Sequence, residues 1–277
     1  MRQRLAEMSN LRQRIIAAVL GVPIILLAIW YRDWSFALLF VIISALTQLE
    51  FYRLLGLDGN QPLTAYGTAV GCLICVLAYF IETERIDFDN YFLICPASSM
   101  IFLIKLYKKK DMKPFTNIGF TFLGIIYVAV PFALLIVMAL RGDGYHPMLV
   151  VGFLLLMWAS DVGAYFAGTK FGRRKLFERV SPKKSWEGSL GGAIASGLVA
   201  CLLARYDPIL EPWQWYCVGA IIVVTGTYGD LVESLFKRSI AIKDSGTSIP
   251  GHGGFLDRFD GLLLAAPFIV TFLKLFA

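Results

Sequence analysis

The stretch that decides the fold class is Ile118-Gly-Phe-Thr-Phe-Leu-Gly-Ile-Ile-Tyr-Val-Ala-Val-Pro-Phe-Ala-Leu-Leu-Ile-Val-Met-Ala-Leu140, which contains no charged residue. A helix needs about 20 apolar residues to cross the roughly 30 Å hydrocarbon core of a bilayer. The run is long enough, and Pro131 inside it is tolerated in a membrane helix because neighbouring groups can satisfy the freed backbone. The stretch therefore predicts a transmembrane helix.

Eight further apolar runs lie on either side of this stretch. They are Ile15–Trp30, Trp34–Leu49, Thr64–Ile81, Tyr91–Tyr107, Met148–Gly168, Leu190–Ala204, Trp213–Gly229 and Leu262–Phe276. The chain is 57% hydrophobic and 17% charged, whereas soluble proteins are about 45–50% apolar and about 25% charged. Several runs are shorter than a full span, and tilt and aromatic flanks can compensate for that. We expect an all-α polytopic membrane protein with about nine transmembrane helices, rather than a soluble helical protein.

Lysine and arginine set the expected orientation, because loops on the cytoplasmic side are enriched in them. With nine spans and a cytoplasmic N-terminus, 21 of the 26 basic residues fall on the inside. The loop Glu82–Asn90 is acidic and fits the outside. The net charge of +6 is then explained by attraction to anionic lipid, and no nucleic acid is expected as a partner.

The chain divides by character into two parts. Residues 1–147 are mostly plain spans and are expected to form a lipid-facing scaffold, whereas residues 148–277 carry polar groups in and beside the membrane and are expected to be catalytic. Asp161 lies inside an apolar run, in Trp158-Ala-Ser-Asp-Val-Gly-Ala-Tyr165. A carboxylate there is costly, and it is therefore a functional candidate. The alternative is a carboxylate near the helix end that is solvated or paired with a lysine.

A basic loop follows, with Gly168-Thr-Lys-Phe-Gly-Arg-Arg-Lys175 and then Ser181-Pro-Lys-Lys-Ser-Trp-Glu-Gly188. Lysine and arginine supply charge for phosphate, and glycine and serine let backbone N–H groups approach it. The alternative is a loop that only anchors the topology. Phe171, Trp186 and the glycines are not needed for an anchor, so we favour phosphate binding.

A third polar cluster contains four carboxylates. Asp230, Glu233 and Lys237 share one face if their segment is helical, and Asp257 and Asp260 are also three residues apart. These acids can converge on a divalent metal, and the glycines 251, 253 and 254 can let a phosphate approach the backbone. Acids for a metal beside bases for phosphate are what phosphoryl or nucleotidyl transfer needs. A solvated loop with surface ion pairs is the alternative.

The segment Ser234-Leu-Phe-Lys-Arg-Ser-Ile-Ala-Ile-Lys-Asp-Ser-Gly-Thr-Ser-Ile-Pro-Gly-His-Gly-Gly-Phe-Leu-Asp-Arg-Phe-Asp260 closely resembles the signature of the phosphatidate cytidylyltransferase (CDP-diacylglycerol synthase) family. Ser181–Gly188 and Asp161–Tyr165 also look like family segments, and the resemblance is strong over residues 150–265. Ala241-Ile242 stands where the family commonly has a glycine, at a position that carries no charge. The resemblance implies that CTP and phosphatidate give CDP-diacylglycerol and pyrophosphate, with Mg²⁺ and a possible second cation as cofactors.

The resemblance also implies roles for particular residues. The predicted catalytic residues are Asp230, Asp257, Lys237, Arg238 and Arg258; the predicted substrate-binding residues are Lys183, Lys184, Ser185, Lys243, Asp244, His252, Gly253, Gly254 and Asp161; the predicted metal ligands are Asp230, Asp257, Asp260 and Glu233. Whether Asp161 completes the metal site or orients a lysine stays open.

The resemblance further indicates where the protein works and with what. The expected partners are CTP, phosphatidate, the bilayer and a second copy of the chain in a homodimer. The expected location is the bacterial inner membrane, with the active site facing the cytoplasm. A transporter is the main alternative because it also uses intramembrane carboxylates, but it predicts paired repeats, which the sequence does not show. Another lipid-linked transferase, such as one that uses a nucleotide-activated sugar, is the second alternative.

Overall fold

The computed structural model describes residues 10–142, 144–242, 245–246 and 253–277. Its elements in chain order are α2 (Asn10–Tyr31), α3 (Asp33–Leu57), α4 (Thr64–Glu82), η1 (Phe88–Leu93), α5 (Ile94–Leu106), α6 (Pro114–Gly124), η2 (Ile125–Ala129), α7 (Val130–Ala139), α8 (Pro147–Phe171), β1 (Lys175–Phe177), β2 (Ser181–Ser185), α9 (Trp186–Tyr206), α10 (Pro212–Ser239) and α11 (Leu256–Phe276). Apart from the antiparallel β1–β2 hairpin, the regular structure of these residues is helical.

Seven helices of the described part are long and apolar enough to cross a membrane. They are α3, α4, the continuous α6–η2–α7 segment Pro114–Ala139, α8, α9, α10 and α11. The predicted polytopic helical membrane protein is therefore confirmed. The two remaining predicted spans coincide with α2 and with η1 followed by α5. Within α2, Gly21–Tyr31 forms a shorter apolar segment, and α5 has 13 residues. A count of nine crossings therefore stays a prediction.

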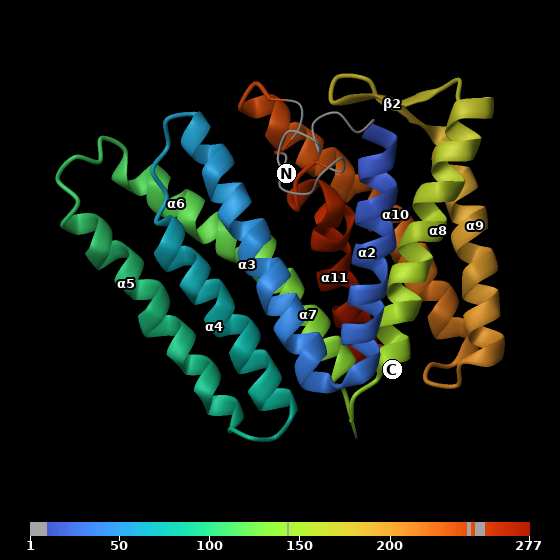
Figure 1. Ribbon diagram of the computed structural model, residues 1–277, viewed down its shortest axis with the longest axis horizontal. Helices are drawn as coiled ribbons and strands as arrows, with labels where there is room; N and C mark the ends of the chain where they lie inside the picture. Colours follow the sequence, from blue (N-terminus) through green and yellow to red (C-terminus); the bar gives the residue numbers. More distant parts are fainter. Residues whose placement is uncertain (1–9, 143, 243–244, 247–252) are drawn as a thin grey trace.

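Successive helices alternate in direction, except that α6, η2 and α7 continue as one segment (Figure 1). The hairpin, the start of α2 and the α5–α6 connection lie at the upper end of the view. The α4–α5, α7–α8 and α9–α10 connections and the C-terminus lie at the lower end. Helices α3 to α7 form one group and α8 to α10 another, and α11 lies between them, in contact with both α7 and α10.

The central apolar stretch runs through a π-helical turn. Pro131 cannot donate a backbone hydrogen bond, and its ring crowds the carbonyl four residues earlier. The chain widens at Ile125–Ala129 into a π-helix, directly before the proline, and the span continues without a break. Phe132 then packs between two other helices, because its ring lies 6.1 Å from that of Phe40 on α3 and 5.5 Å from that of Phe259 on α11. These two edge-to-face ring contacts connect α11 to the first group of helices.

Helices α8 and α9 pack through small residues. A Cβ atom added at Gly163 of α8 would lie 2.5 Å from the carbonyl oxygen of Gly191 and 2.6 Å from Cβ of Ala195, both on α9. In a membrane, helices associate closely where glycine and alanine let their backbones touch. The close pair holds the β1–β2 hairpin, which connects the two helices, above their shared end.

This packing predicts that Gly191→Val destabilises the protein in detergent. A side chain at residue 191 would meet the carbonyl oxygen of Gly163 at 2.7 Å from its Cβ, and overpacking of this kind costs about 1–3 kcal/mol. Gly197→Val on the same helix is the matched control, because nothing lies within 4 Å of a Cβ at that position. Thermal unfolding of both variants measures the difference. Equal unfolding temperatures would show that α8 and α9 do not depend on this contact.

Candidate functional site

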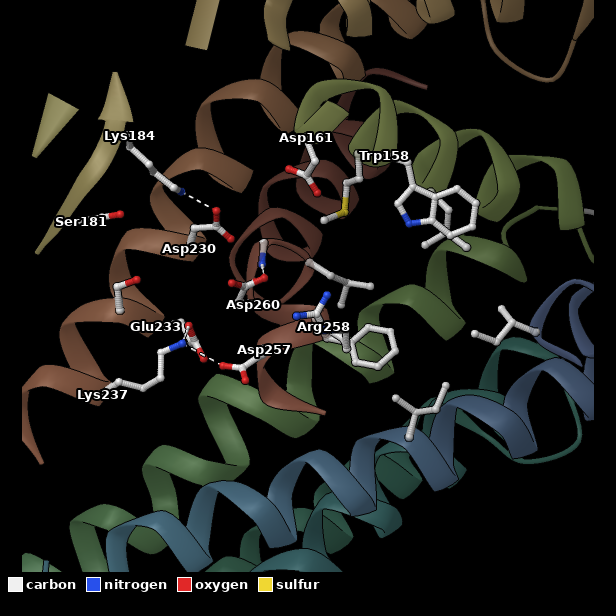
Figure 2. A pocket seen from close by; sticks show the side chains of 18 of the residues that line it. Trp158, Asp161, Ser181, Lys184, Asp230, Glu233, Lys237, Asp257, Arg258 and Asp260 are labelled. Carbon is white, nitrogen blue, oxygen red and sulfur yellow. Dashed lines mark hydrogen bonds and ion pairs between the residues drawn. The ribbon is translucent and has the colours of Figure 1, made fainter. Parts of the chain in front are cut away.

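The site begins where the backbones of α10 and α11 meet. A Cβ atom added at Gly229 of α10 would lie 2.7 Å from the carbonyl oxygen of Asp260 and 2.9 Å from Cα of Gly261. Only glycine allows this approach. Because the next residue of α10 is Asp230, the contact sets the carboxylates of Asp230 and Asp260 facing one another, as Figure 2 shows.

A cavity of about 570 Å³ opens beside this contact. It collects charged side chains from four separate segments: Asp161, Lys184, Asp230, Glu233, Lys237, Asp257, Arg258 and Asp260. Its remaining wall is largely apolar, with Ile25 of α2, Phe40 and Ile43 of α3, and Met157 and Trp158 of α8. The structure thus brings together eight of the predicted site residues, in a pocket that has one charged wall and one apolar wall.

Lys184 connects the hairpin to α10. Its Nζ lies 2.5 Å from Oδ2 of Asp230 (Figure 2). The same Nζ donates a hydrogen bond to the carbonyl oxygen of Thr227 at 3.0 Å. The Lys184 side chain is 25% exposed and that of Asp230 is 38% exposed. This ion pair is therefore accessible to a ligand, and Lys184 is directed at the cavity rather than only at the membrane surface.

Lys237 forms a second and more deeply buried charge cluster. Its Nζ lies 2.7 Å from Oε2 of Glu233 and 2.8 Å from Oδ1 of Asp257. The other oxygen of Asp257 accepts hydrogen bonds from the backbone N–H groups of Ser245 and Gly254, both at 3.3 Å. Two carboxylates thus share one ammonium group, which compensates charges that would be costly to bury alone.

The four carboxylates predicted as metal ligands line one cavity but fall into two pairs. Asp230 and Asp260 face one another beside Lys184, whereas Glu233 and Asp257 are bridged by Lys237. Within residues 10–142, 144–242, 245–246 and 253–277, no group of three or more acidic, histidine or cysteine side chains is arranged to hold a metal ion. Their role as metal ligands stays a prediction.

Other predicted residues lie outside the cavity. Arg238 is on the exposed side of α10 and lines neither cavity described here. Ser185 caps α9, where its Oγ accepts a hydrogen bond from the backbone N–H of Gly188 at 3.2 Å. Gly253 has φ +88°, which favours glycine. Lys243, Asp244 and His252 lie outside the described residues.

A second cavity of about 520 Å³ lies on the other side of Lys184, between α8, α9, α10 and the hairpin. It is lined by the lysines 175, 183 and 184, by small residues of α8 and α9, and by Ser185. Asp161, Lys184 and Asp230 line both cavities and form the wall between them. The second cavity therefore offers an excess of positive charge directly beside the acidic one.

The sequence reasoning missed Glu50. This residue lies on α3, in the part of the chain expected to be only a scaffold, and is 6% exposed. Its carboxylate accepts hydrogen bonds from Phe255, Leu256 and Ser245, next to the cavity. A signal existed, because Glu50 directly follows an apolar run and acidic residues within a span are functional candidates.

Comparison with known proteins identifies the class of protein first. Residues 12–276 match the cytidylyltransferase family, and the chain belongs to that family. Among its relatives are phosphatidate cytidylyltransferases of three bacteria. The identity is 32% with that of Staphylococcus saprophyticus (92% of this chain, 94% of the relative), 30% with that of Bacillus subtilis (98% and 100%) and 33% with that of Brucella suis (98% and 96%).

These matches confirm the predicted family and enzyme class. The chain is a nucleotidyltransferase of the phosphatidate cytidylyltransferase group, as its Ser234–Asp260 segment indicated. The same matches favour this prediction over the transporter and the sugar-transferase alternatives, since the similarity extends over nearly the full length of each relative.

The buried charge cluster predicts different effects for two neighbouring basic residues. Lys237→Ala leaves Glu233 and Asp257 without their shared ammonium group, and removal of one partner from a buried pair costs about 3–5 kcal/mol. Arg238→Ala removes an exposed charge and is expected to change the free energy of unfolding by less than about 0.5 kcal/mol. Thermal unfolding in detergent compares them. Similar losses for both variants would contradict the buried cluster.

Proposed function

We propose that the charged cavity is the place where CTP reacts with phosphatidate to give CDP-diacylglycerol and pyrophosphate. The observation that carries this proposal is the two-sided lining of the pocket. Lys184 and Arg258 offer positive charge to phosphate groups, while Phe40, Ile43 and Trp158 offer an apolar surface to a lipid. A soluble nucleotide and a lipid phosphate have to meet at such a boundary.

The two basic groups most available to a substrate are Lys184 and Arg258. Lys184 is partly exposed and forms an ion pair with Asp230, which is more exposed still. Arg258 lines the cavity and has no ion-pair partner among the residues that the structure describes. Lys237 is already held by two carboxylates, so we assign it to holding Glu233 and Asp257 in place. The lysines of the second cavity extend the positive surface for a second phosphate group.

The reaction needs little proton transfer from the protein. A phosphate oxygen of phosphatidate, as the dianion, attacks the α-phosphorus of CTP, a new P–O bond forms, and the bond to the pyrophosphate oxygen breaks. The charge that develops on pyrophosphate is stabilised by fixed positive groups, for which Lys184 and Arg258 are the candidates.

The donor chemistry of the site fits Mg²⁺, which prefers carboxylate oxygens and keeps substrate phosphates and waters among its ligands. Asp230 and Asp260 face one another, and the buried Oε1 of Glu233 has no hydrogen-bond partner among the described residues. We propose that Asp230 and Asp260 bind the ion directly. Asp257 and Glu233, which are paired with Lys237, lie next to these two ligands. When bound, Mg²⁺ would supply charge neutralisation at the phosphates. A second cation and the homodimer stay predictions.

The activity is tested by transfer of radiolabel from CTP into a chloroform-soluble product in the presence of phosphatidate and Mg²⁺. Asp260→Asn keeps the shape of the side chain but removes its charge, and we expect turnover to fall on the order of 100-fold, or about 2.7 kcal/mol. Excess Mg²⁺ should restore part of the activity. Asp58→Asn, which alters an exposed carboxylate just after α3, is the control and should stay fully active. Full activity of Asp260→Asn across a Mg²⁺ titration would remove this residue from the metal site.

We further propose that α2 begins on the cytoplasmic side of a bacterial inner membrane, that nine helical segments cross it, and that the cavity opens toward the cytoplasm. This orientation is supported by the clustering of basic residues in the α8–α9 connection, which lies at the same end as the start of α2 (Figure 1).

Cysteine accessibility in a cysteine-free background tests this topology. Glu84→Cys lies in the acidic loop after α4 and Glu178→Cys in the turn of the hairpin, and both glutamates are exposed. A membrane-impermeant thiol reagent added to intact cells should label residue 84 and reach residue 178 only after the membrane is opened. Labelling of both residues from the same side would overturn the orientation.

A further inference from the structure

The beginning of α11 is held by a carboxylate from the other half of the chain. Glu50 lies on α3 and is 6% exposed. Its Oε2 accepts a hydrogen bond from the backbone N–H of Phe255 at 3.1 Å. Its Oε1 accepts one from the backbone N–H of Leu256 at 3.1 Å and one from the hydroxyl of Ser245 at 2.9 Å. A buried acidic group is thus directed at the segment that leads into the cavity.

These contacts replace an ordinary helix cap. The first N–H groups of a helix have no acceptor within the helix and need one from outside. The residue at the cap position of α11 is Phe255, whose side chain cannot accept a hydrogen bond and does not do so. Glu50 supplies the acceptor from α3, and its negative charge is also favourable at the positive end of the helix dipole.

The capped turn carries the charged residues of the cavity. Asp257, Arg258 and Asp260 all lie in the first turns of α11. Two residues beside Glu50 also hold Asp257, because the backbone N–H groups of Ser245 and Gly254 both donate to its Oδ2. Glu50 itself does not line the cavity, so it acts on that site through the backbone that it holds.

Gly254 fits the same arrangement. A Cβ atom at this position would collide with Oε1 of Glu50 and with Oγ of Ser245. The space beside Gly254 is therefore taken by the carboxylate of Glu50, and the need for glycine here follows from that contact. Gly254 was predicted to bind phosphate, whereas its N–H is used by Asp257 and its open side by Glu50.

We propose that Glu50 is a positioning residue for the transfer reaction: it fixes the start of α11 and, through it, the places of Asp257, Arg258 and Asp260. The inference rests on the function proposed for the cavity. It gives the first half of the chain a part in the site beyond that of a scaffold, because α11 lies between α3 and α10 (Figure 1) and is tied to both.

Glu50→Gln is the first test, because the amide keeps one acceptor oxygen and places an NH₂ group where a backbone N–H must be accepted. We expect kcat to fall about 10- to 100-fold, since a displacement near 1 Å of a catalytic group can cost about 100-fold. KM for CTP should change far less, because the variant leaves the cavity lining itself unaltered. Hydrogen exchange at the amides of Phe255 and Leu256 should become faster, and this readout does not depend on activity.

Ser245→Ala provides a milder second variant that keeps the two backbone contacts of Glu50 and removes only the hydroxyl donor. It should change kcat and amide exchange in the same direction as Glu50→Gln, but less. It also keeps the test decisive if Glu50→Gln does not fold.

Asp111→Asn is the matched control for loss of a buried carboxylate. Asp111 pairs with Lys105, accepts a hydrogen bond from Nδ2 of Asn117 at 2.7 Å, and lines neither cavity. Its loss should lower the unfolding temperature while leaving kcat of the folded protein and exchange at Phe255 unchanged. If Glu50→Gln and Ser245→Ala behave like Asp111→Asn, or leave exchange at Phe255 and Leu256 unaltered, the positioning role is refuted. Failure of the wild-type protein to label lipid from CTP would instead refute the proposed reaction, and the exchange result would still decide whether Glu50 holds α11.

Discussion

The structure depends on one backbone contact, between α10 and α11 at Gly229. Two helices that carry carboxylates would ordinarily stay apart, because side chains and like charges separate them. Here the missing side chain of Gly229 lets α10 lie against the carbonyl of Asp260. The contact puts Asp230 next to Asp260 and leaves Glu233 about one turn and Lys237 about two turns further along α10, opposite Asp257. The cavity, its charge pairs and its access to the hairpin all follow from this crossing.

The cost of burying charge explains how the rest of the site is arranged. An isolated carboxylate in a low-dielectric interior is strongly unfavourable, and the deeper acids accordingly have partners. Asp257 and Glu233 share Lys237, and Glu50 is satisfied by backbone N–H groups and a hydroxyl. The more exposed pair, Lys184 with Asp230, is the one that a charged ligand can open at a smaller cost. Burial therefore separates the groups that hold the site from those available to substrates.

Much of this could be predicted from the sequence because the signals are local. Apolar runs indicated the helices, and the unusual density of charge near Asp161, Lys184 and Asp257 indicated the cavity. The rest depends on contacts between distant segments, which periodicity does not report. Glu50 and Ser245 are 195 positions apart in sequence. Arg238 is exposed, whereas Lys237 directly before it is largely covered by Glu233 and Asp257. This difference, and the division of the acids into two pairs, depend on how α10 packs against α11. Gly254 was predicted to contact phosphate. Its actual neighbour is Glu50 on α3, a residue 204 positions away that the local sequence around Gly254 does not indicate.

The wall shared by the two cavities has a consequence for how they fill. Asp161, Lys184 and Asp230 face both spaces, and the ammonium of Lys184 neutralises a carboxylate that borders each of them. A phosphate bound in one cavity attracts the ammonium of Lys184 and takes it away from Asp230. The uncompensated carboxylate of Asp230 then favours binding of a cation in the other cavity and disfavours binding of an anion there. Occupancy of one space thus alters the affinity of its neighbour, and thermodynamic linkage makes that influence equal in both directions. Lys184 therefore couples the two cavities through its single ion pair with Asp230.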